Sequence, residues 1–164
     1  MRIYLDTCCL MRAFDDQSYP RVRLETMAIS DVMEYFQAGL LTWISGKPLY
    51  QEISVCPAHD RREKALKWLR LVDEWQDYTS EVARLAKRFA KRSLGEWDAR
   101  HVATAEIAKC GWVLTTDLTP IKRANKLPNL SVRVGNPTEA ILEDIQGIFP
   151  SCPRLDWTTP SMNL

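Results

Sequence analysis

The 164-residue sequence has almost no net charge, no long apolar run and no regular spacing of cysteines. Its formal charge of +1 excludes a protein that coats nucleic acid through overall positive charge. No uninterrupted apolar run approaches membrane-spanning length, so no membrane contact is expected. The N-terminus leads directly into an apolar segment, which leaves no room for an export signal, and we expect a cytoplasmic protein.

The cysteines do not form a recognisable metal or disulfide pattern. They are odd in number, include an adjacent pair and lack Cys-x-x-Cys spacing: Cys8, Cys9, Cys56, Cys110 and Cys152. This pattern suggests neither a disulfide framework nor a zinc site, so we expect buried or neutral thiols.

Hydrophobic residues make up 46% of the chain and charged residues 26%, as in ordinary globular proteins. The length suits one domain with one core. We expect this domain to span residues 1–148, followed by an extended or partly disordered tail at residues 149–164 that carries three prolines and little periodicity.

Short apolar, β-favouring runs alternate with segments of helical periodicity. The predicted strands are Ile3–Thr7, Leu40–Ser45, Trp112–Asp117 and Ser131–Val134. A turn-rich connection is expected at Leu10–Tyr19, and the predicted helical segments are Leu24–Phe36, Lys47–Val55, Asp60–Trp75, Ser80 to about Ser93, Asp98–Lys109, Pro120–Asn125 and Asn136 to about Ile148. This alternation predicts a single α/β domain with a parallel sheet of four or five strands, covered by helices on both faces.

Four acidic residues occur where this architecture would bring them together. Asp6 and Asp117 end strands, Glu52 lies in the helix after the second strand, and Asp98 lies in the first turn of its helix. Strand carboxyl ends and the helix N-termini that follow them share one edge of a parallel sheet. Each acid by itself is more often a cap or a solvated charge, but the coincidence of four favours a shared site.

Carboxylates held this close repel one another unless a cation neutralises them. Oxygen ligands without a matching His or Cys set suit Mg²⁺ or Mn²⁺, and such an ion supports hydrolysis of phosphodiesters. His101 lies on the helical face of Asp98, but we interpret it as a hydrogen-bonded structural residue and not as a ligand.

Four short motifs carry these acids: Leu5-Asp6-Thr7, Ser45 with Glu52 seven residues later, Asp98 to Ala105, and Leu114 to Asp117. Together they resemble the PIN domain family, which includes the VapC-type toxins of toxin–antitoxin pairs. The resemblance covers roughly Met1 to Glu139. Cys8 and Cys9 depart from the residues that many members carry, and the tail is longer than in compact toxins.

The resemblance implies a Rossmann-like three-layer fold and Mg²⁺- or Mn²⁺-dependent cleavage of single-stranded or structured RNA. It also implies a homodimer and an antitoxin protein as partner. By the same resemblance, Asp6, Glu52, Asp98 and Asp117 are the metal-binding acids, and Thr115 is a hydroxyl that positions water or a ligand.

A basic stripe precedes the Asp98 helix and consists of Arg84, Lys87, Arg88, Lys91 and Arg92. It is either a solvated helix face or a surface that holds RNA phosphates. Four tryptophans are either base-stacking residues or core: Trp68, Trp75, Trp97 and Trp112.

Two other functions compete with the nuclease. An aspartyl-phosphate phosphatase also begins with an Asp after the first strand, but it requires an acid two residues later, where Cys8 stands. A catalytically silent PIN-fold domain that binds RNA or a protein partner is the other alternative, and the presence of all four acids argues against it.

Overall fold

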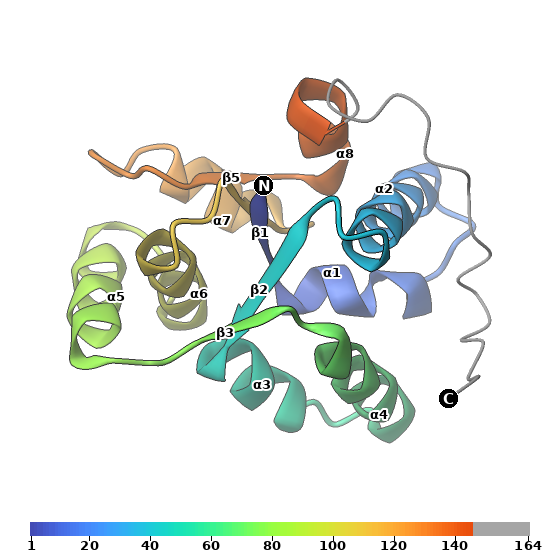
Figure 1. The fold of residues 1–164 in the computed structure, drawn as a ribbon, viewed down its shortest axis with the longest axis horizontal. Coiled ribbons are helices and arrows are strands. Elements are labelled where there is room, and N and C mark those ends of the chain that lie inside the picture. The colour runs from blue at the N-terminus through green and yellow to red at the C-terminus, as the bar shows by residue number, and fades with distance from the viewer. Residues whose placement is uncertain (146–164) are drawn as a thin grey trace.

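The computed structural model describes residues 1–145, which form five parallel strands and the helices that connect them (Figure 1). The strands are β1 (Arg2–Leu5), β2 (Thr42–Gly46), β3 (Glu74–Gln76), β4 (Trp112–Leu114) and β5 (Arg133–Gly135). Their order in the sheet is β3-β2-β1-β4-β5, and every neighbouring pair is parallel. The predicted α/β class with a parallel sheet is confirmed, and the arrangement is that of a PIN-like fold.

The central strand β1 is buried on both faces. Ile3, Tyr4 and Leu5 have no exposed surface, and β1 pairs with β2 on one side and β4 on the other. Burial on both faces explains why the central strands appear in the sequence as continuous apolar runs and not as alternating ones.

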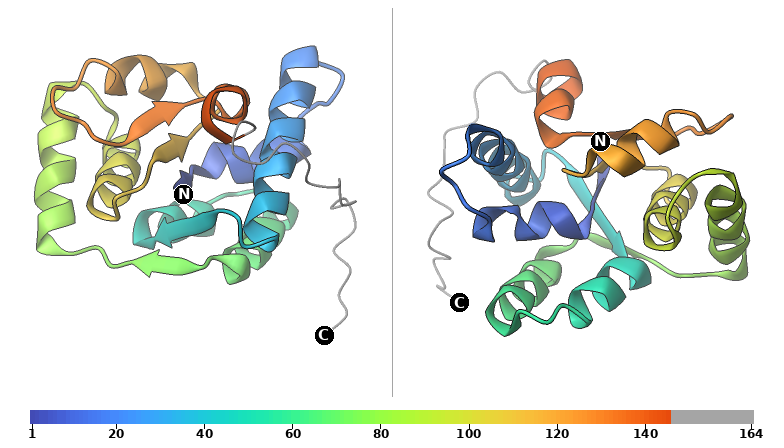
Figure 2. Two further views of the ribbon diagram at one scale, coloured as in Figure 1. Left: turned by 45° about the horizontal axis from the view of Figure 1, so that its top comes forward. Right: turned by 180° about the vertical axis from the view of Figure 1, so that it is seen from behind.

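Helices cover both faces of the sheet. Their bounds are α1 (Thr7–Met11), α2 (Pro20–Gln37), α3 (Lys47–Ser54), α4 (His59–Trp68), α5 (Ser80–Arg92), α6 (Glu96–Ile107), α7 (Leu118–Ala124) and α8 (Pro137–Ala140). Figures 1 and 2 show α1, α2 and α4 on one side of the sheet and α5, α6 and α7 on the other. Within residues 1–145, no helix has both the length and the apolarity that crossing a membrane requires.

The predicted helix Asp60–Trp75 is wrong beyond Trp68. A 3₁₀ turn at Leu69–Leu71 follows α4, and Trp75 lies in β3. Asp73 aligns this segment with β2, because its side chain accepts a hydrogen bond from the backbone N–H of Trp43 at 2.7 Å and its own N–H donates to the carbonyl of Trp43 at 3.1 Å. Because β3 is an edge strand with two exposed residues, it lacks the apolar pattern that marks the inner strands.

The chain after β1 was also predicted incorrectly. The expected turn-rich connection begins instead with α1, which continues through a 3₁₀ turn at Arg12–Phe14. In α2, two of the apolar residues whose helical spacing predicted this helix are exposed, Leu24 by 59% and Met27 by 48%. The buried face includes Glu25, whose charge hid it from the hydrophobic pattern.

The helix start at Asn136 is confirmed. The Asn136 side chain and Glu139 form a capping box, and Pro137 occupies the first helical position. The helix α8 ends at Ala140, and a π-type turn follows at Ile141–Ile145. The predicted continuation to Ile148 and the tail at residues 149–164 lie outside the described residues.

Candidate metal centre at the carboxyl edge of the sheet

The carboxyl edge of the sheet brings together side chains from β1, α3 and α6. One ligand atom each of Asp6, Glu52 and His101 lies within 4.8 Å of the other two. Asp6 directly follows β1, while the other two residues lie on helices that pack against each other. Two of the four predicted acids, Asp6 and Glu52, therefore lie close together at the edge of the sheet, beside His101.

Asp6 is held by several donors. Its Oδ1 caps α1 by accepting a hydrogen bond from the backbone N–H of Thr7 at 2.8 Å. Its Oδ2 accepts from the hydroxyl of Thr115 at 2.8 Å and from the thiol of Cys8 at 3.2 Å. These contacts fix the orientation of a carboxylate that is 13% exposed.

Glu52 is oriented by a buried chain of polar side chains. Its Oε2 accepts hydrogen bonds from Nε2 of His101 at 2.9 Å and from the hydroxyl of Thr7. The phenol of Tyr4 lies 2.8 Å from Nδ1 of His101. Because an ionised carboxylate only accepts hydrogen bonds, Nε2 of His101 carries the proton, and Tyr4 satisfies the opposite nitrogen.

The charges around His101 change the protonation of both partners. Burial by itself would lower the pKa of His101, but the hydrogen bond with Glu52 and the charges of Asp6, Glu52 and Asp98 raise this pKa above its usual value. Burial opposes ionisation of Glu52 too, yet the hydrogen bonds from His101 and Thr7 bring its pKa below the usual value. The pair therefore favours a negative Glu52 beside a proton-carrying His101.

Asp98 lies in the first turn of α6 and is not part of the group formed by Asp6, Glu52 and His101. Its carboxylate folds back over Gly95, so that a Cβ added to Gly95 would lie 2.9 Å from Oδ2 of Asp98. Burial raises the pKa of Asp98, and the charges of Asp6, Asp117 and Glu52 raise it further, while His101 opposes them. Asp98 thus experiences the negative potential of the other three acids.

Asp117 is the most exposed of the four acids. Its Oδ1 caps α7 by accepting from the backbone N–H of Thr119 at 2.7 Å, and its own N–H donates to the hydroxyl of Thr115 at 3.2 Å. Thr115 therefore links Asp117 to Asp6. Asp98 and Asp117 are outside the tight group of Asp6, Glu52 and His101, and they form the outer part of the centre.

This donor set fits a hard divalent cation. Carboxylate oxygens from several chain segments converge, and their mutual repulsion is reduced when a cation lies between them. Asp6 and Glu52 offer the innermost oxygens, with Asp98 and Asp117 next to them. Nε2 of His101 is hydrogen bonded to Glu52, so in this structure His101 orients a candidate metal ligand, the carboxylate of Glu52.

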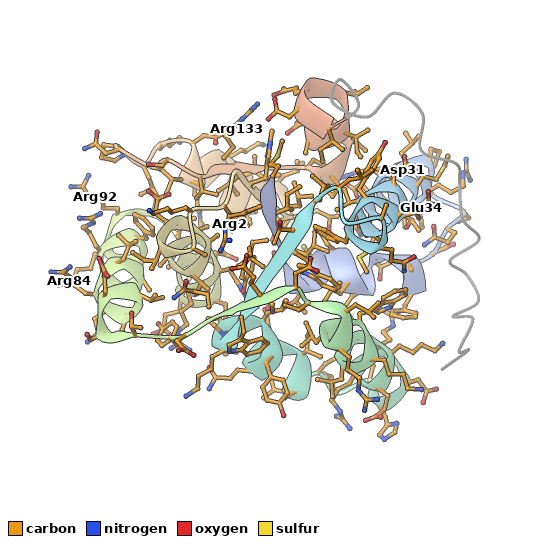
Figure 3. The ribbon with its side chains drawn as sticks, in the orientation of Figure 1. Arg2, Asp31, Glu34, Arg84, Arg92 and Arg133 are labelled. Carbon is orange, nitrogen blue, oxygen red and sulfur yellow. The ribbon has the colours of Figure 1, made fainter. Side chains whose placement is uncertain are left out.

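The basic stripe on α5 is exposed along its whole length. Its members are Arg84, Lys87, Arg88, Lys91 and Arg92, and Figure 3 shows Arg84 and Arg92 extending away from the protein. The helix ends three residues before Gly95, the N-cap of the helix that carries Asp98. The stripe is therefore close in sequence to the helix that carries Asp98.

The tryptophans divide into two groups. Trp112 is buried, with the guanidinium of Arg133 at 4.0 Å from its ring, and Trp68 is partly buried. Trp75 is 49% exposed and Trp97 36% exposed. Trp97 directly precedes Asp98 in the sequence, and the guanidinium of Arg100 lies 4.8 Å from the centre of its ring.

Sequence reasoning missed how His101 and Tyr4 contribute to the centre. His101 is hydrogen bonded, as we expected, but its partner is one of the predicted metal ligands. Tyr4 gave no signal, because a tyrosine inside an apolar strand is an ordinary core residue. The spacing of three between Asp98 and His101 was the only available indication of a shared site.

Comparisons with known proteins support the fold. No protein-family model matches the chain, and no curated protein matches it. A chain in the crystal structure of VapBC2 from Rickettsia felis, bound to a DNA fragment from the promoter, superposes with a TM-score of 0.55 and 12% sequence identity. The match covers 83% of this chain and 98% of that chain, so the two share a fold over most of their length.

Proposed function

We propose that this protein is a divalent-metal-dependent endoribonuclease that hydrolyses phosphodiester bonds of RNA with Mg²⁺ or Mn²⁺. The observation that carries the proposal is the convergence of Asp6 and Glu52 with the outer acids Asp98 and Asp117 at one edge of a PIN-like fold. The likeness to a chain of the VapBC2 complex supports the proposal at the level of the fold.

In this proposal, Asp6, Glu52, Asp98 and Asp117 hold the cation, and Thr115 orients the carboxylate of Asp6 through the hydrogen bond at 2.8 Å. A divalent cation supplies charge neutralisation for the phosphodiester and makes a nearby water easier to deprotonate. His101 and Thr7 hold Glu52 in place, which keeps the ligand oxygens close before the cation binds.

The exposed stripe on α5 is the proposed RNA-binding surface. Each lysine or arginine side chain that contacts a phosphate releases a counterion from the RNA. The RNA affinity is therefore expected to depend steeply on the salt concentration. Trp97, at the start of the next helix, offers a ring on which a base can stack.

A protein partner is part of the proposal. Three apolar side chains on α2 or directly before it are exposed: Tyr19, Leu24 and Met27. In this proposal an antitoxin or a second copy of this chain covers them. We propose a cytoplasmic toxin of a toxin–antitoxin pair that forms a homodimer. Light scattering of the pure protein tests the dimer, and Leu24→Asp is the variant expected to weaken it.

Cleavage of a mixed RNA pool tests the enzyme. The pure protein is assayed with Mg²⁺ or Mn²⁺, with EDTA, and as the Asp6→Asn variant. Removal of a ligand that helps to supply several kcal/mol of charge stabilisation predicts a rate loss of at least about 100-fold. Asp60→Asn is the matched control, because Asp60 is 95% exposed and its ion-pair contact within residues 1–145 is with His59.

Cleavage in EDTA, or equal cleavage by Asp6→Asn and the unaltered protein, would contradict the proposed mechanism. RNA binding without metal-dependent cleavage would favour the alternative of a catalytically silent RNA-binding domain.

A further inference from the structure

An open groove lined by two arginines lies next to the acidic centre. Its lining residues are Cys8, Arg12, Arg21, Thr116, Asp117 and Leu118. Cys8 and Asp117 belong to the surroundings of the centre, so the groove is continuous with it. The arginines come from the segment after α1 and the start of α2, on the opposite side of the sheet from α5 (Figures 1 and 2).

A buried carboxylate positions both guanidinium groups. Glu25 is 2% exposed, and its oxygens bind Nη2 of Arg12 and Nε of Arg21, each at 2.8 Å. The side-chain amide of Asn136 donates to the same carboxylate at 2.7 Å. The arginines are therefore held at the groove by a buried anchor and do not sample many rotamers.

Arg21 is the arginine that a ligand can reach. Its side chain is 54% exposed, compared with 17% for Arg12. Besides its contact with Glu25, it donates from Nη2 to the carbonyl of Thr116 at 2.8 Å, which holds it against the residue before Asp117. A guanidinium has five N–H donors, so these contacts leave donors for a ligand.

The groove combines arginines with one exposed carboxylate. Among the described residues, the ion pairs of Arg12, Arg21 and Arg61 involve Glu25 and Asp15, and the carboxylate of Asp117 lines the groove itself. Arg21 shares Glu25 with Arg12 at 2.8 Å and with the amide of Asn136 at 2.7 Å. The exposed part of the Arg21 guanidinium therefore lies in the same groove as Asp117, one of the acids proposed to hold the cation.

We infer that the groove binds a backbone phosphate of single-stranded RNA adjacent to the bond that is cut, through the guanidinium of Arg21. This inference rests on the proposed function. A planar guanidinium matches two phosphate oxygens at once. RNA is favoured over an acidic peptide because the groove continues into the acids that would hold the metal.

The test measures the affinity of a labelled single-stranded oligoribonucleotide in Ca²⁺, by fluorescence anisotropy over a range of KCl concentrations. Arg21→Ala is expected to lose about tenfold in affinity, as for one charge-assisted hydrogen bond. The slope of log affinity against log salt is expected to become shallower by roughly 0.7 for the lost phosphate contact. Arg21→Lys keeps the charge and is expected to retain the slope with an intermediate affinity.

Arg23→Ala is the matched control. Arg23 lies on the same helix and is exposed, and its side chain bonds to backbone carbonyls of Gln17 and Ser18. Thermal unfolding of each variant shows whether it is still folded. The binding data give a second check, because loss of the fold would weaken binding by Arg21→Lys as severely as by Arg21→Ala. An unchanged slope and affinity in Arg21→Ala would overturn the inference.

A parallel cleavage assay in Mn²⁺ separates this inference from the proposed function. Arg21-dependent binding without Mn²⁺-dependent cleavage would support the groove and contradict the nuclease. Metal-dependent cleavage with no effect of Arg21→Ala on binding would contradict only the groove. Absence of RNA binding by the unaltered protein at every salt concentration would overturn both.

Discussion

The buried hydrogen bond between Tyr4 and His101 gives the sharpest prediction. Tyr4 has no exposed surface, His101 is 2% exposed, and the phenol lies 2.8 Å from Nδ1. Tyr4→Phe keeps the ring but leaves this nitrogen buried without its partner. An unsatisfied buried polar group costs about 1–3 kcal/mol, so the free energy of unfolding is expected to fall by about 2 kcal/mol.

Chemical denaturation in EDTA measures this loss without a contribution from metal. For a chain of this size, roughly 2–4 °C in Tm corresponds to 1 kcal/mol, so thermal unfolding is expected about 4–8 °C lower. The hydrogen bonds that link Tyr4 to His101 and His101 to Glu52 orient the Glu52 carboxylate. The Mn²⁺ concentration at half-saturation is therefore also expected to rise by about 10-fold or more.

Two controls decide whether the hydrogen bond is the cause. Tyr50→Phe makes the same chemical change at a side chain that is 50% exposed, and we expect no measurable loss of stability. A double-mutant cycle of Tyr4→Phe with His101→Leu is expected to show a coupling of about 0.5–3 kcal/mol. Additive effects of the two substitutions, or equal effects of the two tyrosine substitutions, would refute the reasoning.

Three further predictions concern the charges and thiols. Burial and the neighbouring charges raise the pKa of Asp98, so its ionisation at neutral pH destabilises the folded state relative to the unfolded chain. Asp98→Asn is therefore expected to raise the Tm of the metal-free protein at pH 7 and to reduce the stabilisation by Mn²⁺; an unchanged Tm in EDTA would contradict this. Gly95→Ala places a Cβ 2.9 Å from the Asp98 carboxylate and is expected to weaken Mn²⁺ binding in thermal-shift titrations, whereas full Mn²⁺ affinity would show that Asp98 can move without cost. Burial raises the pKa of Cys110 to about 12, whereas Cys56 is partly exposed. Iodoacetamide at pH 8 is therefore expected to label Cys56 and leave Cys110 unmodified, as measured by mass spectrometry. Labelling of both cysteines at similar rates would argue against the burial of Cys110.

Most of the inner sheet was predictable from local patterns. The strands around Tyr4, Ile44 and Val113 are buried on both faces, so their apolar runs stand out in the sequence. The capping box at Asn136 is equally local, because its hydrogen bonds join residues three positions apart. The edge strand containing Trp75 was not predictable, since it is exposed and depends on contacts of Asp73 with β2.

The sequence by itself determined the fold class and the positions of the four acids along the chain, because strand ends and helix starts are local features. Only the tertiary structure decided that Asp6, Glu52 and His101 lie within 4.8 Å of one another, that His101 and Tyr4 orient Glu52, and that Glu25 holds two arginines beside the acids. These contacts join residues that are far apart in the sequence. They depend on side-chain orientations that the hydrophobic periodicity of the sequence does not predict. Their geometry is fixed only when the helices pack on the sheet.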